Sequence, residues 1–168
     1  MSAGALTRED VFAILDEVMD PEVPVLSVVE LGIVRDVTLD GAGVTVTITP
    51  TYSGCPAMRV IEEEITAALA ANGFASVLLE TVYAPAWTTE WMSAAAKEKL
   101  RAYGIAPPGR AHRDSLVMLT RARAVEQISC PYCGSLNTEI RSEFGSTACK
   151  SIGYCKGCEQ PFEAFKAL

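Results

Sequence analysis

The sequence predicts an α+β protein in two parts: a small α-β-β-α-β-α domain with a three-stranded mixed sheet, and a short cysteine-rich ribbon after it. Up to residue 104, apolar positions switch between helical spacing and alternation in period two. All of the closely spaced cysteines fall between residues 130 and 168. With 168 residues, 49% hydrophobic and 21% charged, the chain lies in the globular range, which disfavours disordered and coiled-coil classes.

The domain is predicted to open with a helix over residues 7–18, where apolar residues recur at helical spacing. Thr7 is the expected N-cap, and Asp10 three residues later forms a variant of the capping box. Two prolines within residues 20–24 then end the helix, because proline cannot continue the hydrogen-bond ladder.

Two strands are predicted over residues 34–39 and 44–48, and the glycine-containing turn at 40–43 joins them as a hairpin. A helix over residues 57–71 leads to a further strand over residues 76–83. Because a helix connects them, this strand and the one before the helix are expected to pair in parallel.

A last helix over residues 89–103 completes a domain of residues 1–104. Residues 105–127 are more polar and basic, and we interpret them as a linker with one extended apolar piece at 116–119. The ribbon then occupies residues 128–168.

The charge of the chain is uneven. Residues 1–104 hold 6 Lys and Arg against 15 Asp and Glu, a net charge of -9, whereas residues 105–168 hold 8 against 6, a net charge of +2. An acidic main domain disfavours a nucleic-acid binder, which needs a clustered basic surface. The sequence shows neither an export signal nor a membrane-spanning apolar run, so we expect a cytoplasmic protein.

Two C-x-x-C pairs, separated by 21 residues, have the spacing of metal-binding loops. The four cysteines are Cys130, Cys133, Cys155 and Cys158. Four soft thiolates in tetrahedral geometry favour zinc, with rubredoxin-like iron as the alternative. The competing interpretations are reduced core cysteines and structural disulfides, but so short a ribbon could hardly fold without a metal.

Such a four-cysteine zinc ribbon has no open coordination position, which predicts a structural or partner-binding role rather than catalysis. Cys149 lies outside both pairs. We interpret it as a spare thiol, with exchange into the zinc set as the alternative. Gly134 and Gly157 are expected to supply the permissive backbone that these turns use.

Cys55 stands alone at the start of the helix over residues 57–71. Pro56 is expected at the first helical position, which makes Cys55 the N-cap or nearly so. There its sulfur would face unpaired N–H groups and the positive end of the helix dipole, which lowers a thiol pKa. The alternative is a small buried cysteine that fills the turn.

Asp20 and Glu22 form a second polar cluster, in a loop, and the competing interpretation, which the residues alone favour, is helix termination with solvated carboxylates. The sequence shows no phosphate-binding loop and no catalytic arrangement around the single histidine, His112. We therefore lean towards a protein that is not itself an enzyme.

Several short motifs occur here in the order seen in a known family. They are Asp20-Pro-Glu22, residues 29–34, Thr51-Tyr-Ser-Gly-Cys55-Pro56, residues 85–87 and Met92-Ser93. Over residues 8–104 the chain thus resembles the iron-sulfur maturation family that includes SufT. With residues 143–150 before the second cysteine pair, the ribbon resembles the PaaD family of phenylacetate degradation.

This resemblance implies a SufT-like iron-sulfur maturation domain at residues 1–104 and a role in assembling or delivering an iron centre. It implies that Cys55 is a reactive or iron-handling thiol and that Asp20 and Glu22 belong to the same site. One thiolate and two carboxylates cannot enclose a cluster, so ligands must come from a second copy, as in a homodimer, or from a client protein. Iron or an iron-sulfur cluster would therefore be bound only in transit.

The first functional hypothesis is an accessory protein for maturation of the multicomponent phenylacetyl-CoA epoxidase, a monooxygenase of aromatic catabolism. Its partners would be the oxygenase or reductase subunits, with other iron-sulfur assembly proteins as further partners. The alternative is a stoichiometric, non-catalytic epoxidase component that aids assembly or electron transfer. A zinc-ribbon nucleic-acid adaptor is a third hypothesis, which the acidic domain disfavours.

Overall fold

The computed structural model describes residues 6–41, 43–109 and 128–167. The chain divides into two compact units, Met1–Trp87 and Thr88–Leu168. The helix predicted over residues 89–103 therefore lies in the same unit as the ribbon and not with the preceding domain, where the sequence pattern predicts it. The predicted extended piece at 116–119 and His112 lie outside the described residues.

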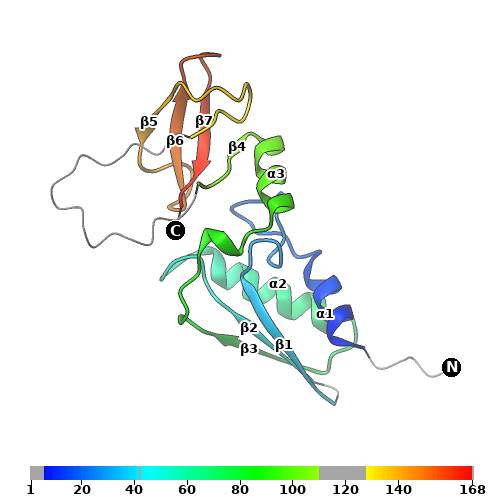
Figure 1. Ribbon diagram of the computed structural model, residues 1–168. Helices are drawn as coiled ribbons and strands as arrows, with labels where there is room; N and C mark the ends of the chain where they lie inside the picture. The colour runs from blue at the N-terminus through cyan, green and yellow to red at the C-terminus, as the bar shows by residue number, and fades with distance from the viewer. Residues whose placement is uncertain (1–5, 42, 110–127, 168) are drawn as a thin grey trace. The chain divides into compact units, whose positions relative to one another are not determined.

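The first unit contains a mixed sheet with the strand order β1-β2-β3 (Figure 1). β1 (Val34–Asp40) pairs antiparallel with β2 (Gly43–Ile48), and β2 pairs in parallel with β3 (Ser76–Thr81). The helix α2 (Ala57–Ala71) connects the two parallel strands, as a crossover must. The predicted α+β class and three-stranded mixed sheet are confirmed.

Helix α1 (Arg8–Leu15) carries the predicted capping box: Asp10 N–H donates to Thr7 Oγ1 at 3.2 Å, and Thr7 N–H donates to Asp10 Oδ2 at 2.8 Å. α1 ends earlier than predicted. Beyond it, Met19 forms a bridge with Ser27, so the chain turns back before residue 18 can extend the helix.

The core of this unit lies between the sheet and its two helices, which pack against the strands and each other. Alternate residues of β2 are buried, as the period-two pattern predicts. The fully buried side chains include Val11 and Leu15 of α1, Ile61, Ile65 and Leu69 of α2, and Val46 and Ile48 of β2. Along the described ranges, no helix has the length and apolar character that spanning a bilayer requires.

The second unit contains the ribbon and a helical segment that precedes it. The predicted helix over 89–103 is divided into η1 (Thr89–Trp91) and α3 (Ala94–Tyr103), because Met92 is extended and Ser93 caps a new helix. A four-stranded sheet of order β4-β7-β6-β5 follows. Its strands are β4 (Ile105–Ala106), β5 (Thr138–Ser142), β6 (Lys150–Cys155) and β7 (Pro161–Phe165).

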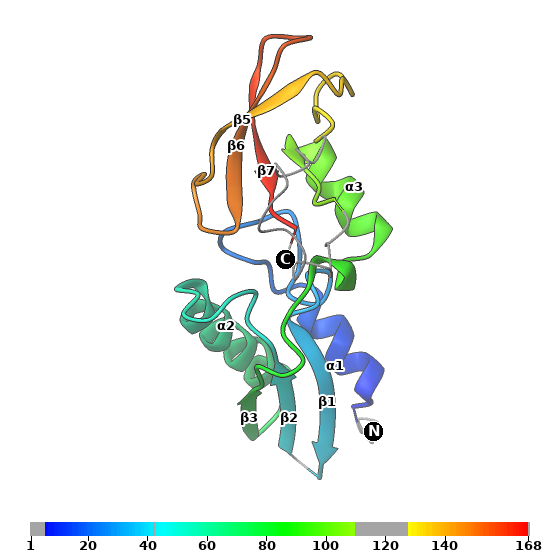
Figure 2. The same cartoon turned by 60° about the vertical axis from the view of Figure 1, so that its left-hand side comes forward.

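The strand β4 is the unexpected element. It pairs in parallel with β7, although the sequence analysis began the linker at residue 105. Figures 1 and 2 both show α3 beside the ribbon sheet. A strand of two residues cannot show the alternation of buried and exposed side chains, so only its pairing with β7 reveals this element.

Candidate metal centre and the Cys55 loop

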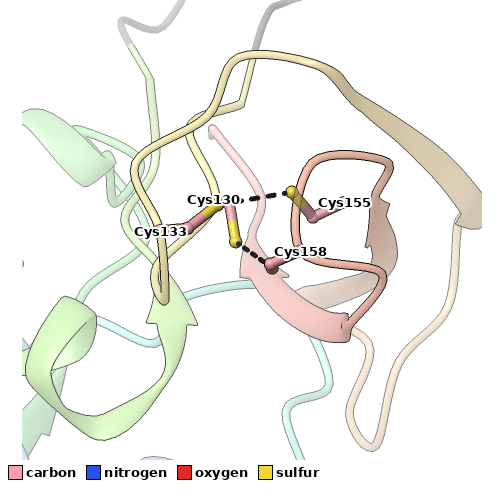
Figure 3. Close-up of side chains that lie close together, drawn as sticks. All are labelled: Cys130, Cys133, Cys155 and Cys158. Atoms are coloured by element: carbon pink, nitrogen blue, oxygen red, sulfur yellow. Dashed lines mark hydrogen bonds between the residues drawn. The ribbon is translucent and has the colours of Figure 1, made fainter.

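Two tight loops of the ribbon bring four cysteines together (Figure 3). The first loop carries Cys130 and Cys133, and the second carries Cys155, the last residue of β6, and Cys158. Their sulfur atoms all lie within 4.8 Å of one another. Within the described ranges, these are the only His, Cys, Asp or Glu side chains that gather in a set of three or more able to hold one ion.

The distances between the sulfur atoms test whether a metal fits. Cys130 Sγ and Cys158 Sγ are 3.7 Å apart, and Cys133 Sγ and Cys155 Sγ are 3.6 Å apart. A tetrahedron with zinc–sulfur bonds of about 2.3 Å has edges of about 3.8 Å, whereas a disulfide requires about 2.05 Å. All four cysteines are free thiols. The group therefore has the dimensions of a four-coordinate metal site.

The backbone of each loop turns by means of a residue with positive φ directly after its second cysteine. That residue is Gly134 in the first loop, as expected, and Glu159 in the second, with φ of 74° and 58°. Gly157, which was expected to supply this turn, has another role. Its N–H donates to Cys155 Sγ at 3.3 Å, and a Cβ there would lie 3.0 Å from Ser135 Oγ.

Burial divides the four cysteines into two pairs. Cys130 and Cys155 are buried, whereas Cys158 is half-buried and Cys133 is exposed. The two buried cysteines belong to a small apolar cluster whose other members are Ala106, Phe162 and Ala164. A bound ion would therefore have a dry side formed by the ribbon core and an open side towards solvent.

The thiols of the second loop differ in acidity. Backbone N–H groups of Cys158 and Gly157 lower the pKa of Cys155 to about 6, although burial opposes them. Burial raises the pKa of Cys158. Cys155 is therefore the first of these two to become a thiolate, and a bound dication would favour the thiolate at all four positions.

Cys149 does not belong to this group. Its side chain is buried, and its sulfur lies 3.1 Å from Thr147 Oγ1. This position agrees with the prediction that Cys149 lies outside the metal set.

An ion pair that the sequence analysis missed holds the loop before β6. Lys150 is buried, and its Nζ lies 3.1 Å from Glu163 Oε2 on β7. The other carboxylate oxygen of Glu163 accepts the N–H of Ser146 at 2.8 Å. Residues 13 apart meet only because β6 and β7 pair, so no local signal could have revealed this contact.

Cys55 lies beside the start of α2, as predicted, but it precedes the N-cap instead of being the N-cap. Pro56 is the N-cap, and Ala57 is the first residue of the helix. Cys55 N–H donates to the carbonyl oxygen of Tyr52 at 3.3 Å, and the carbonyl oxygen of Cys55 accepts the N–H of Met58 at 3.2 Å. The residue is half-buried, so a partner molecule could reach it.

The carboxylate of Asp20 organises its own loop. Asp20 is buried, and its Oδ1 accepts the N–H groups of Glu22 at 2.8 Å and Val23 at 2.7 Å. Glu22 is half-buried. This turn is what the helix-termination interpretation expects, and in the described structure Cys55, Asp20 and Glu22 do not form a second metal-holding set.

The two loops nevertheless leave the same end of the sheet. Val34, the first residue of β1, pairs with Ile48, the last residue of β2. The loop with Asp20 and Glu22 comes before β1, and the loop with Cys55 comes after β2. Thr49 N–H donates to the carbonyl oxygen of Ile33 at 2.8 Å, which joins the two segments.

Both parts of the chain match known families. Residues 8–77 match a family model described as an iron-sulfur cluster assembly protein, and residues 115–166 match one described as the PaaD zinc beta ribbon domain. These matches confirm the resemblance to the two families.

The chain is also similar to two proteins of known sequence and to one crystal structure. A protein of Escherichia coli, named as one of the subunits of a "Putative 1,2-phenylacetyl-CoA epoxidase", is 43% identical over 95% of this chain and 92% of its own length. An Fe-S protein maturation auxiliary factor of Bacillus subtilis is 38% identical over 54% of this chain and 89% of its own. A domain of unknown function from Bacillus anthracis has a TM-score of 0.53 at 33% identity, covering 55% of this chain and 90% of that one.

The identity to the Escherichia coli protein extends through both units, whereas the other two similarities cover about half of the chain. The similarity to that protein therefore spans both family regions matched in this chain. The chain belongs to the PaaD family of phenylacetyl-CoA epoxidase proteins.

Proposed function

We propose that this protein is an accessory maturation factor for the multicomponent phenylacetyl-CoA 1,2-epoxidase of aerobic phenylacetate degradation. It would help to assemble or deliver the iron or iron-sulfur centre of a client protein. One observation carries the proposal: a single chain joins an iron-sulfur cluster assembly domain to the ribbon of a family named for this epoxidase.

The iron-handling residue in this proposal is Cys55. Its half-buried thiol lies beside the start of α2, at the end of the sheet where the Asp20 loop also emerges. A single protein thiolate can hold iron only while other ligands complete the coordination, so the client or a second copy supplies them. Because Asp20 Oδ1 already accepts two backbone N–H groups, we assign Asp20 to shaping the loop and Glu22 to contacting the cargo.

We assign zinc to the ribbon, with Cys130, Cys133, Cys155 and Cys158 as its ligands. Zinc supplies a fixed tetrahedral centre without redox chemistry, which suits a structural site. The sulfur spacing of 3.6 and 3.7 Å supports this assignment, and the small apolar cluster beside it could hardly maintain the fold alone. Metal analysis of the purified protein tests it directly, since rubredoxin-like iron would be coloured.

The maturation role is tested by the iron content of the client. The oxygenase and the reductase are expressed with wild-type protein, without it, or with Cys55→Ala, and iron and epoxidase activity are measured in the same samples. Ser53→Ala is a matched control, because Ser53 is an exposed residue of the same loop. We expect iron-poor, inactive client without the protein or with Cys55→Ala. Full iron loading with Cys55→Ala would remove the role assigned to that thiol.

The relative's designation as an epoxidase subunit favours one alternative, a stoichiometric non-catalytic component of the complex. In that case the partners would be fully loaded with iron in its absence and would remain inactive until the protein is added back. Stable co-purification with the oxygenase would accompany this result.

A further inference from the structure

The segment that contains η1, α3 and β4 lies between residues 77 and 115, outside both matched family regions. It belongs to the same compact unit as the ribbon. Its last element, β4, is an edge strand of the ribbon sheet, with Ile105 opposite Glu163 and Ala106 opposite Ala164 on β7. The helix α3 therefore runs directly into the ribbon fold.

The end of this segment is also part of the core beside the metal ligands. Ala106 is completely buried and belongs to one apolar cluster with Cys130 and Cys155. Two of the four sulfur ligands thus share their core with β4. A change that disperses these cysteines removes the packing partners of Ala106 as well.

A second connection joins α3 to the first metal-binding loop. Gly104 ends α3 in the left-handed conformation, with φ of 93°. The ring of Tyr132, between Cys130 and Cys133, lies so close that a Cβ on Gly104 would be 3.2 Å from its Cε1 and Oη atoms. Tyr132, Gly104 and Ile105 also line one groove of about 320 Å³.

The length of α3 makes these connections important. α3 has ten residues, and an isolated helix of this length is marginal in water. Its stability therefore comes from tertiary contacts, and its carboxyl end makes them with the ribbon. The buried cluster of the ribbon has Phe162 as its one large side chain, with alanines and cysteines around it, and a metal ion must supplement so small a core.

We propose that metal binding by the four cysteines keeps α3 folded, so that the helix senses the metal state of the ribbon. With the ion bound, Tyr132 and β7 hold Gly104 and β4 in place. Without it, the ligand loops separate, β4 loses its partner and α3 unfolds.

Trypsin tests the proposal on the wild-type protein, because Lys97, Lys99 and Arg101 all lie on α3. Cleavage after these residues is followed by mass spectrometry in zinc-loaded protein and after metal removal by a chelator. We expect metal removal to accelerate this cleavage at least tenfold. Cleavage after Arg59 on α2 provides the control and should not change. Continued protection of α3 in metal-free protein would overturn the proposal.

Variants of Tyr132 test the second connection. Tyr132→Ala should still bind one zinc ion per chain, yet lose protection of α3 in the loaded state, whereas Tyr132→Phe should retain it. If Tyr132→Ala protects α3 as well as the wild type, the role given to the contact with Gly104 is wrong. Neither experiment involves Cys55 or a client, so the outcome is independent of the proposed maturation role.

Discussion

Replacing Gly153 by alanine should weaken the ribbon through a clash that can be located atom by atom. Gly153 lies on β6 directly opposite Phe162 on β7. A Cβ on Gly153 would lie 2.5 Å from Cζ and 2.6 Å from Cε2 of that ring. Carbon atoms in good contact are about 3.5–4.0 Å apart, so the ring would have to move by about 1 Å.

The ring has little room for this movement, because Phe162 is only 3% exposed and packs with Cys130 and Cys155. Overpacking of this kind costs about 1–3 kcal/mol. Alanine gains about 0.5–1 kcal/mol over glycine in a strand, because it restricts the unfolded chain. With the middle of each range, the expected net loss is about 1.3 kcal/mol.

The assay is competition for zinc between the protein and a chelator, since folding of the ribbon and metal binding are coupled. A loss of about 1.3 kcal/mol corresponds to zinc binding that is about 9-fold weaker. Gly43→Ala on β2 is the control, because its Cβ would meet nothing closer than 3.4 Å. A Gly153→Ala protein that holds zinc as tightly as wild type would refute the reasoning.

Three further predictions concern buried or charged groups. Thr49 Oγ1 is buried without a hydrogen-bond partner among the described residues. Thr49→Val removes this unpaired hydroxyl and should raise the free energy of unfolding, measured by urea denaturation, by about 1–2 kcal/mol. A variant with a lower free energy of unfolding than the wild type would contradict this. Glu163→Gln removes the negative charge that faces the buried ammonium of Lys150. The free energy of unfolding of zinc-loaded protein, measured by thermal unfolding, should fall by about 1–3 kcal/mol. This loss is smaller than for a fully buried ion pair, because Glu163 is partly exposed. Hydrogen bonds from the backbone and side chain of Thr7 lower the pKa of Asp10 below its usual 3.8. The stabilisation by the Asp10 carboxylate is therefore fully present above pH 3.8 and disappears as the pH falls through the lower pKa of the folded protein. An NMR titration of the Asp10 carboxyl group with a midpoint at or above pH 3.8 would contradict this stabilisation.

The elements that the sequence analysis located well have strong local signals. The helix over residues 57–71 has the predicted limits, because proline precedes it and Asn72-Gly73 follows it. The four ribbon cysteines were found from spacing alone, since a C-x-x-C loop brings both sulfurs to one side through local geometry. The position of Cys55 beside the start of a helix was predicted from Pro56, whereas its role as a reactive thiol rests on the resemblance and stays a prediction.

The features that were missed depend on contacts between distant residues. β4 has too few residues to show a period, and it exists because β7 offers an edge to pair with. The pair of Lys150 and Glu163 likewise forms only when β6 and β7 lie side by side. Cys55 was the predicted helix cap and Gly157 the predicted turn residue, but Pro56 caps the helix and Glu159 takes the positive φ. Which residue fills either role depends on the surrounding backbone.

The sequence by itself determined the α+β class, the order of the main elements and the group of four cysteines that could hold a metal. Hydrophobic period, helix-ending residues and cysteine spacing are properties of short stretches of chain, so they can be recognised before folding. Only the tertiary structure decided that α3 and β4 belong with the ribbon and that Tyr132 contacts Gly104. These arrangements arise from packing between residues far apart in the chain, for which local sequence carries no signal.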